Sequence, residues 1–492
     1  MMQVRPQLSR MPDAAPGHES RVFDVSNLNR LQQATWVATA TVLLALLLKS
    51  GSAEDMLSAW LITGVALIPV HVWIRRGAST LPIFPVVATA HIIYFALPLS
   101  SDHPELAMYD GQERLTAAVT VVLFLAASLA GWIAGLSLLR QASVTPSLDD
   151  LDNSSLKSVV LAGLGIGLLF QGLTSAGNLD FLSEWYPVLR AFVWNLLFAV
   201  TFMVGVLRGE GRLSGNVGRA CLAGVVLNVL SSWASLFLVH GIVLCGVGLA
   251  GYVLGAKRIP VKTLLAAFVL TFVLHAGKGE MRERYWVEGG QNVAAHVADI
   301  PSRLSEWFTA GLEVLASGQE STSIVERASL MQMLLRAQYM SPDPVPFLGG
   351  ETYALIPALL VPRFLNPEKP ASQAGMDQLN IRYGVLTRED VQSTAVGWGL
   401  MSEAYANFGW IGVLACGLVF GLLIGLVTAW AAGAPPLSAR TMLGVVTMAI
   451  SVSLEADAAA YITSLFQAAI AIYMLSHVIR ALSNRRRTAE YG

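Results

Sequence analysis

Long apolar segments recur along this chain, and they constrain its fold more than any other feature. Most of them approach the roughly 20 residues that an α-helix needs to cross a bilayer. The segments lie at about 34–48, 56–74, 81–99, 115–139, 156–173, 188–207, 218–254, 261–274, 408–432, 441–454 and 461–482. Residues 218–254 are long enough for two helices, with a break near Ser231 and Ser232. The sequence therefore predicts an all-α polytopic membrane protein with about 12 transmembrane helices.

The composition agrees with this fold class and excludes some partners. The 492 residues are 54% hydrophobic and only 13% charged, whereas soluble domains are about 25% charged. The net charge of −1 leaves no basic excess for a nucleic-acid partner. The three cysteines lie in apolar segments, and no Cys/His cluster has the spacing of a metal site. We therefore expect no metal, no cofactor and no nucleic acid.

Basic residues are concentrated in alternate short loops, which predicts the orientation in the membrane. One set of loops carries pairs such as Arg75 and Arg76, and the terminal segments are basic as well. The opposite short loops are acidic, as at Asp102 and Glu105. Because cytoplasmic loops carry the excess of lysine and arginine, we expect both termini in the cytoplasm and the long polar segment 275–407 outside.

This orientation divides the chain into five parts. These are a disordered cytoplasmic tail (1–33), transmembrane helices one to nine (34–274), a large extracytoplasmic loop with amphipathic or re-entrant helices (275–407), helices ten to twelve (408–482) and a basic cytoplasmic tail (483–492). We expect the basic tail to contact the anionic headgroups of membrane lipids.

The first half of the external segment has two helical patterns. A helix that begins near Pro301 would place Trp307 and Phe308 on one apolar face. Such a face suits either a membrane interface or packing on the rest of the loop. A second pattern covers 324–340 and ends at a proline-rich turn.

The stretch that follows, 349–370, reads GGETYALIPALLVPRFLNPEKP and carries the cations Arg363 and Lys369. Its apolar part is too short to cross a bilayer. The residues before its prolines are pushed to extended conformations. We therefore expect a broken, re-entrant-like segment held against the membrane.

Charged side chains beside apolar membrane segments are costly unless they have partners, so they are candidates for function. Three stretches have this character: HAGKGEMRERYW, GWGLMSEAYANFGWIG and LEADAAAY. They supply His275, Lys278, Arg282, Arg284, Tyr285, Glu403, Tyr405, Asn407, Glu455 and Asp457. An ordinary solvated surface is the alternative interpretation for each single cation and for the last two carboxylates.

The order of these motifs resembles a known family. A GGETY stretch followed by IP, PRFLNPEKP and SEAYANFG before a glycine-rich helix, with many helices and one large external loop, is similar to the bacterial oligosaccharide repeat-unit polymerases of the Wzy-type O-antigen polymerase family. The layout covers nearly the whole chain, and 362–370 and 403–409 carry most of the similarity. At 235–241 the chain reads SLFLVHG, with His240 where the family pattern has an arginine-bearing helix break.

The resemblance implies an enzyme of the bacterial plasma (inner) membrane. It would be an integral-membrane glycosyltransferase that polymerises oligosaccharide repeat units, carried on undecaprenyl pyrophosphate, into O-antigen or exopolysaccharide. The resemblance also implies independence of nucleotide sugars and a chain-length co-polymerase as partner.

Such a reaction makes two chemical demands on the protein. Without a metal, the pyrophosphate leaving group needs arginine or lysine, and the cations that adjoin apolar segments are Arg282, Arg284, Arg327, Arg363 and Lys369. The acceptor hydroxyl needs a general base, for which we expect Glu403 first, then Asp457 and His275. Further candidates for the site are Lys278, Tyr285, Tyr353, Tyr405 and Asn407.

Three other functions fit parts of the sequence. A transporter or flippase of lipid-linked glycans would explain the many helices and the charges among them, but we find no six-plus-six repeat. An O-antigen ligase would use the same donor with a lipopolysaccharide acceptor. A scaffold for glycan assembly would need no catalytic residues.

Overall fold

The computed structural model of the chain describes residues 25–47, 52–101, 103–138, 147–148, 151–175, 178–179, 185–236, 238–287, 297–317, 326, 328–363, 365–392 and 394–490. Within these residues the backbone is helical apart from turns, loops and one isolated bridge between Ser147 and Ser438. The all-α class predicted from the sequence is therefore confirmed.

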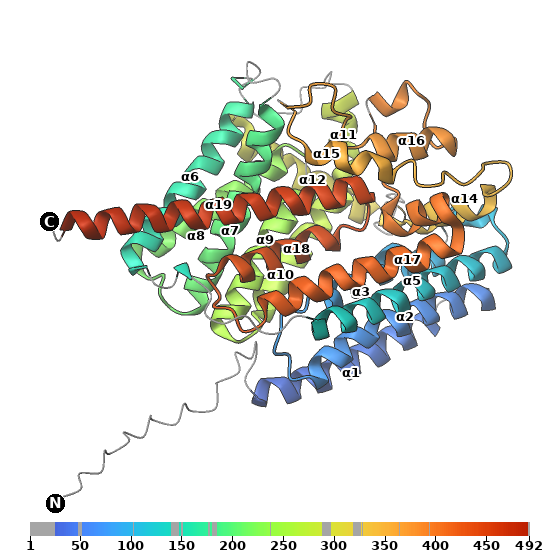
Figure 1. Cartoon of the computed structure of the whole chain (residues 1–492), viewed down its shortest axis with the longest axis horizontal. Helices are drawn as coiled ribbons and strands as arrows, with labels where there is room; N and C mark the ends of the chain where they lie inside the picture. The colour runs from blue at the N-terminus through green and yellow to red at the C-terminus, as the bar shows by residue number, and fades with distance from the viewer. Residues whose placement is uncertain are drawn as a thin grey trace, which may run out of the picture.

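The longer helices form the body of the molecule (Figure 1). They are α1 (Val25–Leu47), α2 (Ala53–Arg75), α3 (Ile83–His91), α5 (Gly111–Leu138), α6 (Asn153–Ser175), α7 (Tyr186–Gly209), α8 (Gly215–Ala234), α9 (Leu238–Ala256), α10 (Val261–Ala276), α12 (Ile300–Ser317), α14 (Met331–Met340), α16 (Ala374–Arg382), α17 (Gly399–Ala431), α18 (Ala439–Val452) and α19 (Ala458–Glu490).

Short helical turns connect them. They are η1 (Ile92–Ala96), α4 (Leu97–Leu99), η2 (Leu106–Met108), α11 (Lys278–Arg282), η5 (Glu283–Val287), η6 (Val297–Asp299), η7 (Tyr353–Leu355), α15 (Ile356–Leu360) and η8 (Asp390–Gln392).

Among the described residues, eight helices are long and apolar enough to cross a membrane: α2, α5, α6, α7, α8, α9, α17 and the Ala458–Val478 part of α19. A ninth span results if α10 and the helix after it count as one, although the two are bent by 55°. The apolar helices Ile83–Leu99 and Ala439–Val452 are shorter. The chain thus has the architecture of a multi-pass membrane protein, while the count of twelve spans stays a prediction.

Helices α2, α5 and α17 lie side by side (Figure 1), and an ion pair joins the starts of the first two. The contact between α5 and α17 is very close. A Cβ atom on Gly131 would overlap the Leu418 carbonyl, and one on Gly421 would overlap the Ser128 carbonyl. Small residues allow membrane helices to approach in this way, so α17 has a firm position against α5.

The apolar side chains form two cores. The larger core lies among α2 to α5, α14 and α17 to α19, and it extends to one side of α6 to α9. The smaller core lies where α6 to α10 meet α11 and α12, and Trp233, Met281 and Trp307 are buried there. The predicted site residues are divided between the two cores: some lie on helices of the larger core and the others on helices of the smaller core.

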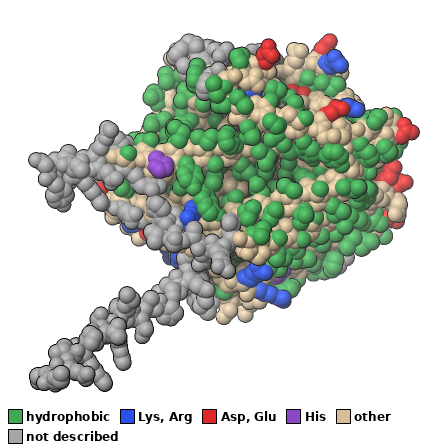
Figure 2. All heavy atoms as spheres, viewed as in Figure 1, with side chains coloured by type: hydrophobic (Ala, Val, Ile, Leu, Met, Phe, Trp, Pro, Cys, Tyr) green, Lys and Arg blue, Asp and Glu red, His purple; other side chains and the backbone are tan. Residues whose placement is uncertain are grey.

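The two ends of the bundle differ. The start of α1 and the end of α19 lie toward one end, whereas α14, α15 and α16 lie at the other (Figure 1). Figure 2 shows acidic side chains along the edge of the molecule near α14 to α16, with lysine or arginine side chains among them, and further lysine or arginine side chains along the lower edge.

Both terminal helices are longer than expected from hydropathy. Helix α1 begins at Val25, inside the expected tail 1–33, and α19 continues to Glu490 through most of the expected tail 483–492. The added turns contain many polar residues, which can be helical. A prediction based on apolar segments leaves such turns out.

Two internal boundaries also differ. Helix α8 passes through Ser231 and Ser232 and ends at Ala234, because both serines can donate their hydroxyls within a helix, as Ser232 does to the Asn228 carbonyl. Helix α17 begins at Gly399 instead of residue 408, so its first two turns belong to the polar segment.

The polar segment contains the expected helix with Trp307 and Phe308. It is α12, and its apolar face is divided: Trp307 is buried against the smaller core, while Phe308 is exposed. The second expected helix is shorter, since α14 begins at Met331. The stretch 349–370 is broken as predicted, because Val361 before Pro362 is extended and ends α15.

Candidate functional site

Helix α17 is broken at Gly409, and the site is built on this break. Gly409 has a φ of 61° and a ψ of −144°, which L side chains rarely adopt. The break leaves the carbonyls of Ala406 and Asn407 without intrahelical donors, and they accept the N–H groups of Leu348 and Gly349, each at 3.1 Å. The broken segment after α14 is thereby docked onto the first turns of α17.

The Asn407 side chain strengthens this docking. Its Oδ1 accepts the Gly350 N–H at 2.9 Å, and its Nδ2 donates to Thr352 Oγ1 and to the Glu403 carbonyl, both at 2.9 Å. Asn407 is fully buried. Both the oxygen and the nitrogen of the Asn407 side chain thus form hydrogen bonds with the protein. Asn407 therefore positions the broken segment and is not placed to bind a ligand.

One turn before Asn407, Glu403 lies beside Asp457 at the start of α19. Glu403 Oε2 accepts the Ala458 N–H at 2.7 Å, and Asp457 Oδ1 accepts the Ala460 N–H at 2.8 Å. Asp457 is thus the N-cap of α19, and both carboxylates lie where the helix dipole favours negative charge. We call Glu403 and Asp457 the carboxylate pair.

Each member of the carboxylate pair has a second oxygen that is buried and makes no hydrogen bond with the described residues. The Thr352 hydroxyl faces Glu403 and the Met376 N–H faces Asp457 as hydrogen-bond donors, but neither contact has the geometry of a full hydrogen bond to the second oxygen. Both carboxylates have no exposed surface. Burial raises the pKa of Asp457, although the Ala460 N–H opposes this. Two adjacent carboxylates with vacant acceptor oxygens can take a proton or bind a hydroxyl group.

Helix α16 closes one side of the carboxylate pair. A Cβ atom on Gly375 would overlap the Asp457 carboxylate, so a larger residue there would displace that side chain. Asp377, two residues later, also acts on Asp457 electrostatically, and burial raises the pKa of Asp377 as well. No sequence pattern indicated Asp377 or Thr352, since neither adjoins a long apolar segment.

Of the three tyrosines predicted for the site, Tyr353 and Tyr405 lie near α17, in different places. Tyr353 stacks on Phe408, with ring centroids 6.1 Å apart, and acts electrostatically on both members of the carboxylate pair. Tyr405 packs edge-on against Phe347 and Trp410. Only Tyr353 therefore belongs to the group around the pair.

The cations of the broken segment have unequal surroundings. Lys369 Nζ donates to the carbonyls of Leu359 and Val361, at 2.5 and 2.8 Å, and so closes the end of α15. Burial, followed by the nearby Arg363 charge, lowers the pKa of Lys369. Arg363 donates to the Lys369 carbonyl at 3.2 Å and has no acidic partner among the described residues. Most N–H donors of the Arg363 guanidinium are therefore available to a ligand, whereas the Lys369 ammonium group already donates two hydrogen bonds to the protein.

Helix α15 connects these cations to the carboxylate pair. It packs against α19, whose first turn both carboxylates cap. Arg363 follows α15 directly and is half-buried. The broken segment thus carries its cations at the same end of the bundle as the pair (Figure 1).

The basic residues after α10 form a separate cluster. Arg284 forms ion pairs with Glu306 and, at 3.1 Å, with Glu280. Tyr285 donates its hydroxyl to Glu306 at 2.6 Å, and the Arg303 guanidinium lies over the Tyr285 ring, 4.2 Å from its centroid. We call these residues the α11–α12 cluster.

The other predicted residues near α11 are also engaged with the chain. His275, Lys278 and Arg282 all interact with other groups of the protein. His275 lies in the last turn of α10, which packs mainly against α12. The structure therefore does not bring His275 beside the carboxylate pair. Arg327 lies outside the described residues.

Glu455 connects the region of the carboxylate pair with the region of α11. Its side chain is exposed, yet surrounding atoms raise its pKa, and Lys278 opposes this shift. Its carbonyl accepts the Gly399 N–H at 3.2 Å, and Gly397 packs so closely that a Cβ atom there would lie 2.7 Å from the Glu455 Cβ. The loop that carries Glu455 and Asp457 is thus held against the start of α17.

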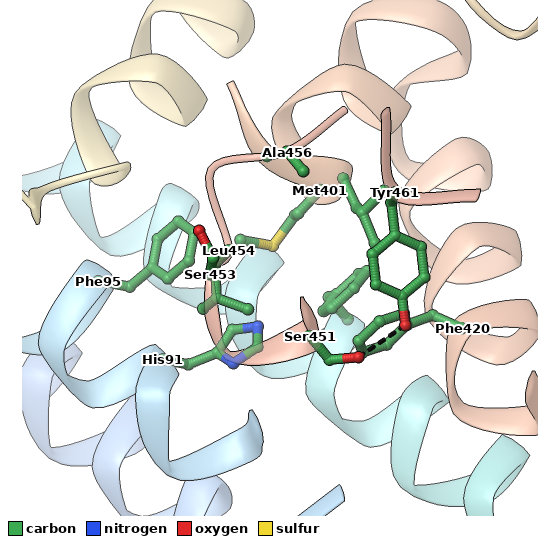
Figure 3. A pocket seen from close by; sticks show the side chains of 12 residues that line it. His91, Phe95, Met401, Phe420, Ser451, Ser453, Leu454, Ala456 and Tyr461 are labelled. Atoms are coloured by element: carbon green, nitrogen blue, oxygen red, sulfur yellow. Dashed lines mark hydrogen bonds between the residues drawn. The ribbon is translucent and has the colours of Figure 1, made fainter. Parts of the chain in front are cut away.

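A small cavity lies on the core side of this loop (Figure 3). His91 and Met401 approach it from opposite sides, and Ser451 and Tyr461 share a hydrogen bond of 2.7 Å at its wall. Its volume of about 20 Å³ has room for about one water molecule. The sequence did not identify His91, which lies within an apolar segment next to the π-helical turn η1.

No described group of three or more His, Cys, Asp or Glu residues could hold a metal ion. Comparison with family models, curated proteins and solved structures finds no match to this chain.

Proposed function

We propose that this chain is a membrane glycosyltransferase that polymerises lipid-linked oligosaccharide repeat units. The observation that carries the proposal is the pairing of two features at one end of the bundle. One is the carboxylate pair, with two vacant acceptor oxygens. The other is Arg363, a half-buried guanidinium without an acidic partner among the described residues.

These features match the two ends of a glycosyl transfer from a pyrophosphate carrier. A guanidinium binds phosphate oxygens through two parallel hydrogen bonds and stabilises negative charge as it develops on the leaving group. We assign this role to Arg363. Lys369 holds the segment in shape, because its ammonium group already serves two carbonyls.

In the proposed reaction Glu403 is the general base, with Asp457 beside it. The acceptor hydroxyl gives its proton to Glu403, and the hydroxyl oxygen bonds to the anomeric carbon of the donor. The bond between that carbon and the pyrophosphate oxygen breaks, and the lipid carrier leaves with both electrons. Since the carboxylate pair is closed to solvent, the η7–α15 segment must move aside to admit the sugar.

The proposal includes a topology. The carboxylate pair and the 275–407 segment lie outside the plasma membrane, both termini lie in the cytoplasm, and twelve segments cross the bilayer. The lysine and arginine residues of alternate short loops support this orientation. The donor is then undecaprenyl pyrophosphate carrying a repeat unit, and a chain-length co-polymerase is the proposed partner.

A gene deletion with complementation tests this function. In the deletion strain, surface polysaccharide on a gel should shorten to single repeat units attached to their final acceptor. Complementation with Arg388→Ala, which removes an exposed cation from the same segment, should restore the full ladder, whereas Arg363→Ala should not. Loss of all surface units would instead indicate a flippase, and full-length polymer left unattached would indicate a ligase.

A further inference from the structure

A pocket lies at the opposite end of the bundle, away from the carboxylate pair. Its volume is about 230 Å³, space for several water molecules at ~30 Å³ each and less than a drug-sized ligand needs. It is bounded by the ends of α2, α5 and α17 and by the turn that leads to α3. The lining residues are Trp73, Arg76, Ser79, Thr80, Trp132, Leu136, Ala429 and Ala432.

The turn that shapes this pocket is fixed by the end of α2. The Gly77 and Ala78 N–H groups donate to the carbonyls of Ile74 and Trp73, at 2.9 and 3.1 Å, which is a Schellman motif. Both residues have positive φ, 81° and 48°. Trp73 Nε1 donates back to the Thr80 carbonyl at 2.8 Å. The hydroxyls of Ser79 and Thr80 are therefore held at the pocket by a defined turn.

The polar groups that remain at the pocket are donors. The Arg76 side chain is exposed and makes no hydrogen bond or ion pair with the part of the chain that the structure describes. Trp132 is 1% exposed, and its indole N–H is buried without an acceptor among the described residues. Guanidinium and indole groups can only donate, and the two hydroxyls can do so as well. A ligand for these groups must be rich in acceptor oxygens.

Backbone carbonyls near the pocket could repel a ligand rich in acceptor oxygens, but these carbonyls already accept hydrogen bonds from the protein. At the end of α2, the carbonyls of Val72, Trp73 and Ile74 accept hydrogen bonds from the following turn. At the end of α17, Ala429 and Ala431 accept from Ala432 and Ala434. The negative ends of these helices are thus capped, and the Arg76 charge remains without a counter-ion among the described groups.

We propose that this pocket binds a phosphate group, with Arg76 as its charged ligand and the headgroup of an anionic membrane lipid as its source. Arginine is the preferred partner of phosphate oxygens. The pocket lies at the ends of three apolar helices, where a lipid headgroup would lie, and its two tryptophans are typical of a membrane interface. This site is independent of the proposed glycosyltransferase activity.

The chain offers a matched control. Arg75 precedes Arg76 on the same helix end, carries the same charge and is also exposed, but it does not line the pocket. The full chain in detergent would be titrated with phosphatidylglycerol, phosphatidylcholine and inorganic phosphate, with thermal unfolding as the readout. We expect a saturable rise in Tm with phosphatidylglycerol for the wild type and Arg75→Gln. For Arg76→Gln we expect an apparent affinity at least about tenfold weaker, since a charge-assisted hydrogen bond is lost.

Trp132→Phe provides a second variant, because it removes the indole N–H while a smaller aromatic ring stays at this buried position. We expect it to weaken the lipid effect less than Arg76→Gln does. A saturable shift with inorganic phosphate alone, abolished by Arg76→Gln, would support the phosphate site and identify free phosphate as the ligand. Equal losses in Arg75→Gln and Arg76→Gln, or an equal response to phosphatidylcholine in all variants, would overturn the proposal.

Discussion

Two basic segments of this chain look alike in sequence but differ in their surroundings. Arg284 in the α11–α12 cluster forms ion pairs with Glu280 and Glu306. Arg363 in the broken segment donates to one carbonyl and has no acidic partner among the described residues. A cation that the protein has already neutralised offers little to an anionic substrate. The comparison therefore assigns a structural role to Arg284 and leaves Arg363 for the pyrophosphate.

Removal of Arg363 tests the proposed phosphate contact most directly. We expect Arg363→Ala to lower the rate of polymerisation by at least about 100-fold, the loss typical of one charge-stabilising donor in an active site. Purified protein with a lipid-linked repeat unit as substrate would give the rate directly. Arg388→Ala is the matched control and should keep near-normal activity. A fully active Arg363→Ala variant would refute the proposed phosphate contact.

The carboxylates of the two regions provide the second test. Glu403→Gln keeps an oxygen that can accept the Ala458 N–H, so the fold should persist, but the amide cannot take a proton. We expect a loss of roughly 100-fold or more, as for removal of a general base. Glu306→Gln changes a carboxylate that serves Arg284 and Tyr285, and its activity should change little.

If Glu403→Gln retains normal chain length, the base assignment is wrong, while the assignment of Arg363 stands. If Glu306→Gln loses as much activity as Glu403→Gln, the α11–α12 cluster takes part in the reaction. Circular dichroism and monodispersity of both variants would separate a loss of chemistry from a loss of fold.

The pH dependence of stability should differ in sign between the regions. Burial raises the pKa of Asp457, so its folded pKa lies above the unfolded value near 3.8. Its contribution to stability falls as pH rises from that value through the folded pKa. The Tyr285 hydrogen bond, followed by Arg284, lowers the pKa of Glu306. Its contribution is present above the unfolded pKa and is lost as pH falls through the folded one.

Thermal unfolding across the acidic range would measure these contributions. We expect Asp457→Asn, which can still cap α19, to gain stability over the wild type as pH rises. Glu306→Gln should instead lose stability relative to the wild type as pH rises. Parallel curves for wild type and Asp457→Asn would show that the Asp457 carboxylate does not carry a buried charge.

Apolar periodicity was sufficient to predict the helical class and most helix positions, because burial in a bilayer requires long apolar runs. The prolines of the sequence also predicted that the segment 349–370 is broken. It could not distinguish Gly409, which breaks α17, from Gly421, which packs within the same helix against α5. Both glycines lie in one apolar run, and only tertiary contacts separate them.

The site was predictable only in part for a similar reason. Glu403 and Asp457 adjoin apolar segments, so the cost of a charge there made them candidates. That they are neighbours, and that Thr352 and Asp377 lie beside them, depends on the docking of the broken segment onto α17. The ion pair of Arg284 with Glu306 could not be inferred either, since Glu306 belongs to a different helix.

The smallest expected effect is that of Arg284→Ala. Arg284 is exposed, with both its acidic partners also partly exposed, and exposed ion pairs contribute little because water screens them. We expect polymerisation to fall by less than about threefold, within the range of surface changes. Adding Glu306→Gln to Arg284→Ala should produce little further loss of activity, because the ion pair between these two residues is already removed. A loss with Arg284→Ala as large as that with Arg363→Ala would mean that an ion pair with the protein does not exclude a cation from binding the substrate, and the distinction between the two basic segments would fail.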